Sequence, residues 1–471
     1  MLPIYGGLYE CAYDRDLRPL EAGSPTAIWR HRQGAAAPDG GARNRRHERP
    51  GRWPNSRSSR ASGRVRRDGD GDGEVTADEV TSRERMAIAM RLREPDRVPV
   101  MCQLSLGHYF LNAGLDPIDI WHGTPEFGEA LIRLQNRYGF DGALVNLPGR
   151  DPNWRSYIKK REQVGADVQV TWKNDFVTIV PPDDNPHVYR PDGTLSRVRF
   201  EDVDPERLFY IEPHDLSGVT YPYSWGFEDE PAEPGPGFFP PWTFDTVRWL
   251  VDHAGPISIH AEVFSPFSQF MELVGYEAGL LALVMDPVKV NACLDRLTDG
   301  AIVLARGQLA AGADAVLISS AFVGAPFISR KHYEAFELPY ERKLISGIKP
   351  EFDVPVYVHT CGAIGDRLDL MMATGIDGID TLDPPPLGTV DLADARRVTK
   401  GRVFLKGNLD PVNELLAGTE ESVLEAARQR IAVAAESGGY ILSTACSVAP
   451  PTSPANILRL REAVELYGRY R

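Results

Sequence analysis

Residues 354–362 read VPVYVHTCG, a nearly continuous apolar run that breaks into glycine just after a histidine and a cysteine. Runs of this kind are typical of parallel strands that are covered on both faces. Seven further strand candidates occur at residues 98–104, 142–147, 256–264, 315–321, 378–382, 402–408 and 439–445. The pattern therefore predicts a parallel sheet of eight strands.

Helical patterns separate these predicted strands. In residues 286–311 the apolar side chains recur at spacings of three and four, as they do on a helix with one buried face: Val290, Leu294, Leu297, Ala301 and Leu304. Repeated strand–helix units indicate a parallel sheet covered by helices, and eight of them indicate a closed barrel. We therefore expect an α/β fold, the (β/α)8 or TIM barrel.

The folded domain is predicted to begin with TSRERMAIAMRLREPDRVPV, residues 81–100. Thr81 or Ser82 is suited to cap a helix, Glu84 lies in its first turn, and Pro95 ends it before the first strand. This pattern places the start of the barrel near residue 81.

A long polar, turn-rich stretch separates the second and third predicted strands. It contains a plausible hairpin at residues 167–182 and a proline-rich loop at residues 229–242. A connection of this length is unusual in a compact domain and is often functional. We expect an insertion over the barrel mouth, as a lid or a partner surface.

Residues 1–80 differ from the rest of the chain. Residues 1–67 hold 14 Arg, 6 acidic residues and no Lys, a net charge of +8, which leaves −22 for the remainder of a chain whose total is −14. Such a segment has too little apolar surface to offset the entropy lost on folding. We therefore predict a disordered Arg/Gly-rich extension over residues 1–80 and one barrel domain over residues 81–471. A basic arm that binds RNA or membrane is the alternative, and whether the extension belongs to the native protein stays open.

Residues 68–79, DGDGDGEVTADE, match the spacing of an EF-hand calcium loop. The preceding residues, RSSRASGRVRR, make a poor entering helix, and no second loop exists to pair with this one. Calcium binding at residues 68–79 therefore stays open.

Composition bounds the partners and the compartment. A net charge of −14 argues against general affinity for nucleic acid. No apolar run approaches the ~18–20 residues that span a membrane, and Asp14 and Arg15 precede any signal-peptide core. The five cysteines are too few and too scattered for a disulfide framework, which suits a reducing compartment. We expect a cytoplasmic protein.

The chemistry concentrates at two predicted strand ends. His359 and Cys361 end the fifth strand, and Cys446 ends the eighth. Catalytic side chains of a barrel come from the C-terminal ends of its strands, and the fifth and eighth strands can face each other across the mouth. Two thiolates and an imidazole suit Zn²⁺ and leave a fourth position for a substrate. The alternative is that both cysteines are small buried hydrophobes.

Residues 81–471 resemble the uroporphyrinogen decarboxylase superfamily, and most closely its zinc-dependent, cobalamin-linked methyltransferases. The segments that carry the resemblance occur in family order: 81–100, 264–275, 312–345, VHTCG at 358–362, KGNLDP at 406–411 and GGYILSTACSVAPPTSPANI at 438–457. The resemblance implies that His359, Cys361 and Cys446 bind catalytic zinc. It also implies that cobalamin arrives on a separate corrinoid protein, since no D-x-H-x-x-G signature of a cobalamin domain is found.

Two departures argue against the decarboxylase itself. The place of its arginine-containing RQAGR segment here reads CQLSLGHYF, residues 102–110, without an arginine. The aspartate expected after the second strand is replaced by Asn146 or Leu147. A tetracarboxylate substrate needs several cations, so their loss is costly. A cofactor-free decarboxylase and a non-catalytic corrinoid- or ligand-binding barrel remain the alternatives.

The resemblance further implies a carboxylate ligand about twenty residues beyond the H-x-C cysteine. Asp383 lies 22 residues beyond Cys361, and Asp380 is the alternative. A capping or loop role for Asp383 is equally open.

Other candidates have weaker support. Glu262 and His260 share one face of the third strand by alternation. Asn408 and Asp410 follow the seventh strand, where a turn or cap role is at least as plausible. We expect Cys102 and Cys293 in the core.

These observations predict a zinc-dependent methyltransferase that moves a methyl group between a small methylated substrate, or a thiol, and a corrinoid protein. The methyl donor, the acceptor, the direction of the reaction and the oligomeric state are not determined by the sequence.

Overall fold

The computed structural model describes residues 80–194, 198–213 and 220–470. Its main sheet has seven parallel strands in the order β1-β6-β7-β8-β9-β10-β11. They are β1 (Gly142–Val145), β6 (Ser258–Phe264), β7 (Ala315–Ser319), β8 (Val356–His359), β9 (Gly378–Thr381), β10 (Phe404–Leu409) and β11 (Tyr440–Thr444). Each falls within, or one residue beyond, a predicted strand, so the barrel order read from the sequence is confirmed.

The predicted first strand, residues 98–104, is irregular. Val100 forms an isolated parallel bridge with Leu442 of β11, and on its other side the Val100 carbonyl accepts a 2.8 Å hydrogen bond from the N–H of Asp141, just before β1. Pro99 has no N–H to donate, which limits the ladder here. The segment nonetheless occupies the eighth position, between β11 and β1, and completes a TIM-barrel fold.

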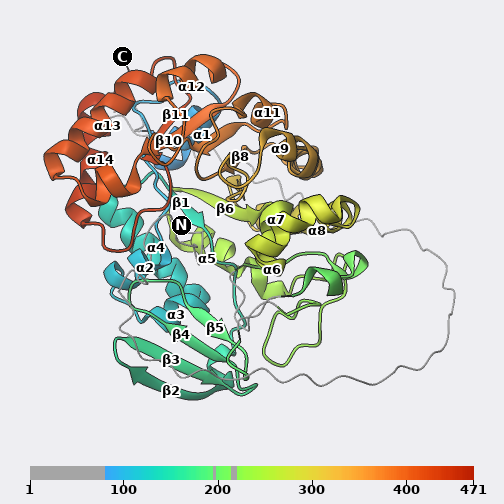
Figure 1. The fold of residues 1–471 in the computed structure, drawn as a ribbon. Helices are drawn as coiled ribbons and strands as arrows, with labels where there is room; N and C mark the ends of the chain where they lie inside the picture. The colour runs from blue at the N-terminus through green and yellow to red at the C-terminus, as the bar shows by residue number, and fades with distance from the viewer. Residues whose placement is uncertain (1–79, 195–197, 214–219, 471) are drawn as a thin grey trace, which may run out of the picture. The chain divides into compact units, whose positions relative to one another are not determined.

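The helices lie outside the sheet (Figure 1). The helix predicted over residues 286–311 is confirmed as α8. The longer helices are α4 (Thr124–Tyr138), α7 (Tyr276–Met285), α8 (Pro287–Ala310), α10 (Leu338–Ile348), α13 (Glu420–Ala434) and α14 (Pro454–Tyr467). Shorter ones are α2 (Leu106–Asn112), α3 (Pro117–His122), α5 (Asp245–His253), α6 (Pro266–Val274), α9 (Arg330–Phe336), α11 (Leu368–Met372), α12 (Leu392–Thr399) and the π-helix η5 (Pro411–Leu416).

Helix α1 (Ser82–Met90) fills the N-terminal end of the barrel. Thr81 caps it: its side chain accepts from the N–H of Glu84, whose carboxylate accepts from the N–H of Thr81, so the predicted capping is confirmed. The buried side chains of α1 pack on the inward residues at the strand starts, in a cluster of Met86, Ala89, Met90, Met101, Leu144, Ala315, Leu317, Tyr357, Phe404 and Ile441. The layer of the barrel next to α1 is therefore mainly apolar.

The insertion between β1 and β6 is also confirmed. It contains a four-stranded antiparallel sheet in the order β2-β3-β4-β5. The predicted hairpin is β3 (Asp167–Trp172) with β4 (Val177–Val180), while β2 (Ile158–Val164) and β5 (His187–Tyr189) were not predicted. Strand β2 reads IKKREQV and is largely exposed, so its sequence carries no apolar run to mark it.

Two sequence predictions concern the start of the chain. The extension over residues 1–80, apart from Val80, and the EF-hand-like loop over residues 68–79 lie outside the described residues. Within the part of the chain that the structure describes, none of the helices combines the length and the apolar character needed to cross a membrane.

Candidate metal centre

Alternation along the strands directs polar side chains into the upper half of the barrel. Tyr357 and Phe404 belong to the inner apolar cluster with α1. Successive inward residues on a strand are two apart. His359 on β8 and Lys406 on β10 therefore also point inward, one layer nearer the C-terminal end.

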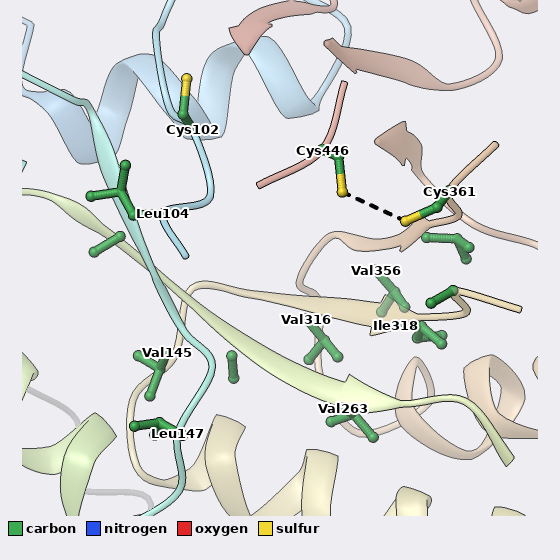
Figure 2. Packing of buried hydrophobic residues seen from close by; sticks show 14 of the residues in the cluster. Cys102, Leu104, Val145, Leu147, Val263, Val316, Ile318, Val356, Cys361 and Cys446 are labelled. Atoms are coloured by element: carbon green, nitrogen blue, oxygen red, sulfur yellow. Dashed lines mark hydrogen bonds between the residues drawn. The ribbon is translucent and has the colours of Figure 1, made fainter. Parts of the chain in front are cut away.

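The three predicted ligands meet at this end. The Sγ atom of Cys361 lies 3.4 Å from Nε2 of His359 and 3.6 Å from Sγ of Cys446. The Sγ atom of Cys446 lies 4.0 Å from the same nitrogen. Figure 2 shows the two thiols pointing toward each other. Residues 85 positions apart in sequence are thus brought together, as their placement on the fifth and eighth strands predicted.

The spacing of the donors fits a tetrahedral zinc site. Zn–S bonds of about 2.3 Å and Zn–N bonds of about 2.0–2.1 Å put neighbouring ligand atoms about 3.5–3.8 Å apart. The three observed separations, 3.4, 3.6 and 4.0 Å, bracket that range. Both cysteines are free thiols. The donor set of two sulfurs and one imidazole nitrogen could therefore hold zinc on one face and leave one position open.

Asp380 and Lys406 orient the histidine. The Nδ1 atom of His359 lies 3.2 Å from Oδ2 of Asp380 on β9, and Nζ of Lys406 lies 3.0 Å from both oxygens of that carboxylate. Burial acts to raise the pKa of Asp380, but Lys406 and His359 lower it below its usual value. An ionised Asp380 accepts the Nδ1 proton and turns Nε2 toward the sulfurs, a common arrangement behind metal-binding histidines.

The pKa of His359 is consistent with these hydrogen bonds. Burial opposes a charged imidazole, but the hydrogen bonds with Asp380 and Cys446 raise the pKa of His359 to about 10. Metal binding releases protons from its ligands. A metal at this site would therefore replace a proton at Nε2 and leave the Nδ1 proton on the side of Asp380.

Glycines position the Cys361 loop. Gly362 has φ +80°, a conformation that other residues rarely adopt, and it turns the chain immediately after the cysteine. Gly324, after β7, approaches the carbonyl of Cys361 so closely that a Cβ there would lie 2.5 Å from that oxygen. The glycine that follows the H-x-C motif thus serves the backbone rather than the chemistry.

The end of β11 is held from two sides, which fixes Cys446. The N–H of Ala445 donates to the carbonyl of Leu409 on β10 at 2.7 Å, and the N–H of Val448 donates to the carbonyl of Gln103 at 2.9 Å. The hydroxyl of Thr444 donates to the carbonyl of Cys446 itself. The thiol therefore projects from a backbone segment that is constrained on both edges.

Asp383 lies close to the three donors. It is buried, and its carboxylate accepts a hydrogen bond from the N–H of Gly362, next to Cys361. Burial and the neighbouring Cys446 raise the pKa of Asp383 to about 7. The group of donors that converges within 4.8 Å consists of His359, Cys361 and Cys446 without Asp383. Its role as a fourth ligand stays a prediction.

The two candidates on β6 occupy different layers. His260 is fully buried in the barrel, with Nδ1 2.7 Å from the hydroxyl of Tyr357 and Nε2 3.0 Å from that of Ser258. Glu262, two residues nearer the mouth, interacts with Ser319 and with the charge of His359. Glu262 therefore borders the candidate metal centre. His260 lies nearer the N-terminal end of the barrel, and both of its ring nitrogens have hydrogen-bond partners.

The remaining candidates take structural positions. Asp410 caps η5 by accepting from the N–H groups of Val412 and Asn413. Asn408 donates through Nδ2 to the carbonyl of Leu382 at 2.9 Å. Cys102 and Cys293 are buried, as expected for core residues, and Figure 2 shows Cys102 directed away from Cys446.

Sequence reasoning missed the roles of Asp380 and Lys406. The segment RVFLKGN places one lysine inside an otherwise apolar strand, and a buried lysine requires a partner. In the sheet, Lys406 pairs in register with Asp380, which pairs with His359. The isolated lysine was a signal, but its partner depends on strand register.

Comparison with known proteins gives the family and several relatives of this chain. The family model described as uroporphyrinogen decarboxylase (URO-D) matches residues 232–467. The methylcobamide:CoM methyltransferase MtbA of Methanosarcina acetivorans is 30% identical over 211 residues, which cover 45% of this chain and 59% of that protein. A uroporphyrinogen decarboxylase of Cupriavidus necator is 37% identical over 168 residues, which cover 34% of this chain and 44% of that protein. The chain spans about half the length of the curated relatives it matches.

A solved structure described as a methyltransferase from Methanosarcina mazei shares the fold. It superposes with a TM-score of 0.59 at 16% sequence identity and covers 83% of this chain and 99% of its own. The family match extends over half of the chain and includes Cys361 and Cys446. The chain therefore belongs to the uroporphyrinogen decarboxylase family.

Proposed function

We propose that this protein is a zinc-dependent methyltransferase that moves a methyl group between a small methylated substrate, or a thiol, and a corrinoid protein. One observation carries the proposal: two thiols and an imidazole nitrogen converge within 4.8 Å at the C-terminal ends of barrel strands. A decarboxylase that works without a cofactor has no use for such a soft donor set, whereas zinc-assisted methyl transfer does.

Each residue of the site has a distinct task in this proposal. His359, Cys361 and Cys446 would hold the zinc, with Asp383 as the candidate fourth ligand. Bound zinc would supply a Lewis acid that activates a thiol or a methylated substrate at its open position. Asp380 holds the Nδ1 proton of His359 and thereby keeps Nε2 directed at the site. The ligands are at most 5% exposed, so the surrounding chain excludes most water.

The charge of the barrel strands favours methyl transfer over decarboxylation of a tetracarboxylate. Within the seven strands of the barrel, Lys406 is the only Lys or Arg. Its ammonium group already contacts both oxygens of Asp380. The strands therefore offer no uncommitted cation to an anionic substrate, in keeping with the loss of arginine from residues 102–110.

A reaction with free cobalamin tests the proposal. The zinc-loaded full chain is mixed with methylcobalamin and 2-mercaptoethanol, and separately with cob(I)alamin and a panel of methyl donors, while the corrinoid spectrum is followed. We expect zinc-dependent methyl transfer in at least one direction, lost in Cys361→Ser.

Cys293→Ser is the matched control, because Cys293 is buried in α8 away from the site. It should retain wild-type transfer. Decarboxylation of uroporphyrinogen without methyl transfer in either direction would contradict the proposal.

A further inference from the structure

Two side-chain amides point into the barrel beside the proposed zinc site. Gln103 follows Met101, a member of the inner apolar cluster, by two residues. Asn408 follows Lys406 of β10 by two residues, and Lys406 contacts Asp380 inside the barrel. Since successive inward residues on a strand are two apart, both amides face the interior of the barrel, nearer its C-terminal end.

Backbone contacts place both amides next to the segment that carries Cys446. The carbonyl of Gln103 accepts a 2.9 Å hydrogen bond from the N–H of Val448, two residues beyond the cysteine. On the other edge of β11, Asn408 pairs in register with Ser443, three residues before the cysteine. Cys446 therefore projects from a strand end that lies between the strands of the two amides.

Each amide has a buried oxygen without a hydrogen-bond partner. Gln103 is 9% exposed and Asn408 is 2% exposed, and among the described residues nothing donates to Oε1 of Gln103 or Oδ1 of Asn408. Nδ2 of Asn408 donates at 2.9 Å to the carbonyl of Leu382, which can only accept, so the free atom of this amide is its oxygen. Buried polar atoms are seldom left unpaired because this is costly, so these oxygens call for a partner.

Asn146 adds a third oxygen of the same kind. It follows Leu144 of the inner apolar cluster by two residues, and within the part of the chain that the structure describes its Oδ1 is likewise buried without a partner. In the order of the barrel, the segment over residues 98–104 lies between β11 and β1, on the side away from β8. Gln103 and Asn146 are therefore placed across the barrel from His359.

We propose that these three amides bind the small substrate of the reaction, and that this substrate is uncharged and donates a hydrogen bond through a hydroxyl or N–H group. The inference rests on the proposed methyl transfer, in which zinc would hold the reacting atom of the substrate while the amides bind its other end. Amide oxygens only accept hydrogen bonds. A sulfonate or carboxylate would offer them only further acceptors, and a purely apolar group would leave them unpaired.

The charges on the strands point to the same class of substrate. Lys406 is the only Lys or Arg in the seven strands, and its ammonium group lies 3.0 Å from the carboxylate of Asp380. An anionic substrate would therefore bring a charge that no strand residue is free to balance. An uncharged hydrogen-bond donor needs no such balance and satisfies the amide oxygens.

Two thiols of nearly the same size test this inference. 2-Mercaptoethanol and 1-propanethiol can both bind zinc through sulfur, but the first ends in a hydroxyl and the second in a methyl group. With zinc-loaded full chain and methylcobalamin, kcat/KM should be at least about tenfold higher for 2-mercaptoethanol, because the methyl group leaves a buried oxygen unpaired. An apolar site would prefer 1-propanethiol. The anionic thiol 2-mercaptoethanesulfonate should also react more slowly than 2-mercaptoethanol.

Gln103→Met and Asn146→Leu each replace one amide by an apolar side chain of similar size. Both should bring the ratio of kcat/KM for 2-mercaptoethanol and 1-propanethiol closer to one. Because both values come from the same enzyme sample, a loss of folded protein cancels from this ratio. Gln135→Met is the matched control: Gln135 is 8% exposed on α4 and donates to the carbonyl of Phe140. It should keep the wild-type ratio.

Calorimetry of thiol binding to the zinc-loaded full chain supplies a readout that does not depend on turnover. The wild type should bind 2-mercaptoethanol more tightly than 1-propanethiol, and Gln103→Met should lose this preference. Equal or tighter binding of 1-propanethiol or 2-mercaptoethanesulfonate, no binding of any of the three thiols, or an unchanged ratio in both Gln103→Met and Asn146→Leu would overturn the inference. Methyl transfer without the preference would leave the proposed function standing, whereas no transfer with any thiol or methyl donor would overturn both.

Discussion

The two ends of the barrel contain buried polar clusters of opposite character. At the N-terminal end, Asp141 accepts five hydrogen bonds of 2.8–2.9 Å: one from Arg85, two from Arg97, one from the N–H of Val100 and one from the hydroxyl of Ser82. At the C-terminal end, three donor atoms of His359, Cys361 and Cys446 converge on one point. One cluster is complete in itself, while the other has the geometry of a ligand set.

This difference indicates that the N-terminal cluster supports the fold and that the C-terminal cluster serves the function. Buried polar groups are stable when they satisfy each other, and Asp141 does so fully. Thiols are weak hydrogen-bond partners, so two of them next to an imidazole gain little from each other without a metal. The N-terminal cluster should therefore govern stability, and the C-terminal cluster should govern metal content.

The largest effect on stability is expected for Asp141→Ala. The change leaves Arg85 and Arg97 as buried charges without their shared partner. Breaking a buried ion pair in this way costs about 3–5 kcal/mol. Urea unfolding should show a loss of this size, with zinc content per folded chain unchanged. A loss of unfolding free energy below about 1 kcal/mol would show that the N-terminal cluster does not govern stability.

Asp380→Asn should act on the other end. It weakens the hold on Nδ1 of His359 and leaves Lys406 without a charged partner. Loss of the group behind a metal-binding histidine typically lowers metal affinity by about 10–100-fold. Competition with a chelator measures this affinity. If Asp380→Asn binds zinc with wild-type affinity, the hydrogen bonds that link His359, Asp380 and Lys406 do not contribute to metal binding.

A third buried cluster predicts a pH effect on stability. Glu337 and Glu341 are fully buried near Ser320, and Tyr333 donates to Glu341 at 2.8 Å. Burial raises the pKa of Glu341 from 4.5 to about 7, although Tyr333 and Ser320 act to lower it, and it raises that of Glu337 as well. The protonated form of Glu341 therefore stabilises the fold fully below pH 4.5, and this contribution is lost as the pH rises through about 7.

Urea unfolding between about pH 5 and about pH 8 tests this linkage. The free energy of unfolding should fall with pH in the wild type and fall less steeply in Glu341→Gln, which removes one of the two interacting acids. If the free energy of unfolding falls equally steeply with pH in both proteins, Glu341 does not keep its proton in the folded state as described.

The smallest effect is expected on the surface. Lys159 pairs with Asp175 in the four-stranded sheet, with both side chains more than half exposed. Exposed ion pairs contribute about 0–1 kcal/mol. Lys159→Ala should therefore leave urea unfolding and zinc content nearly unchanged, and a large loss would mean that the insertion sheet carries more of the stability than its exposure indicates.

The sequence was sufficient to predict what depends on strand ends. The H-x-C motif at residues 359–361 and Cys446 each follow an apolar run, and in a barrel this alone brings them to one rim. The His359–Asp380–Lys406 chain depends on the register of β8, β9 and β10, which no local pattern specifies. Strand β2 was not predicted because its residues are exposed and charged and form no apolar pattern. The weak strand pairing of residues 98–104 reflects Pro99, whose effect on the hydrogen bonds between strands depends on its neighbours.

The proposed methyl transfer depends most directly on bound zinc. Elemental analysis of the purified full chain, beside Cys361→Ser, Cys446→Ser and the buried control Cys293→Ser, measures zinc per folded chain. We predict about one zinc in the wild type and in Cys293→Ser, and its loss in both site variants, as expected when one of three protein ligands is removed. Wild-type protein that binds no zinc, or zinc retained in both Cys361→Ser and Cys446→Ser, would show that these three side chains do not form a zinc site.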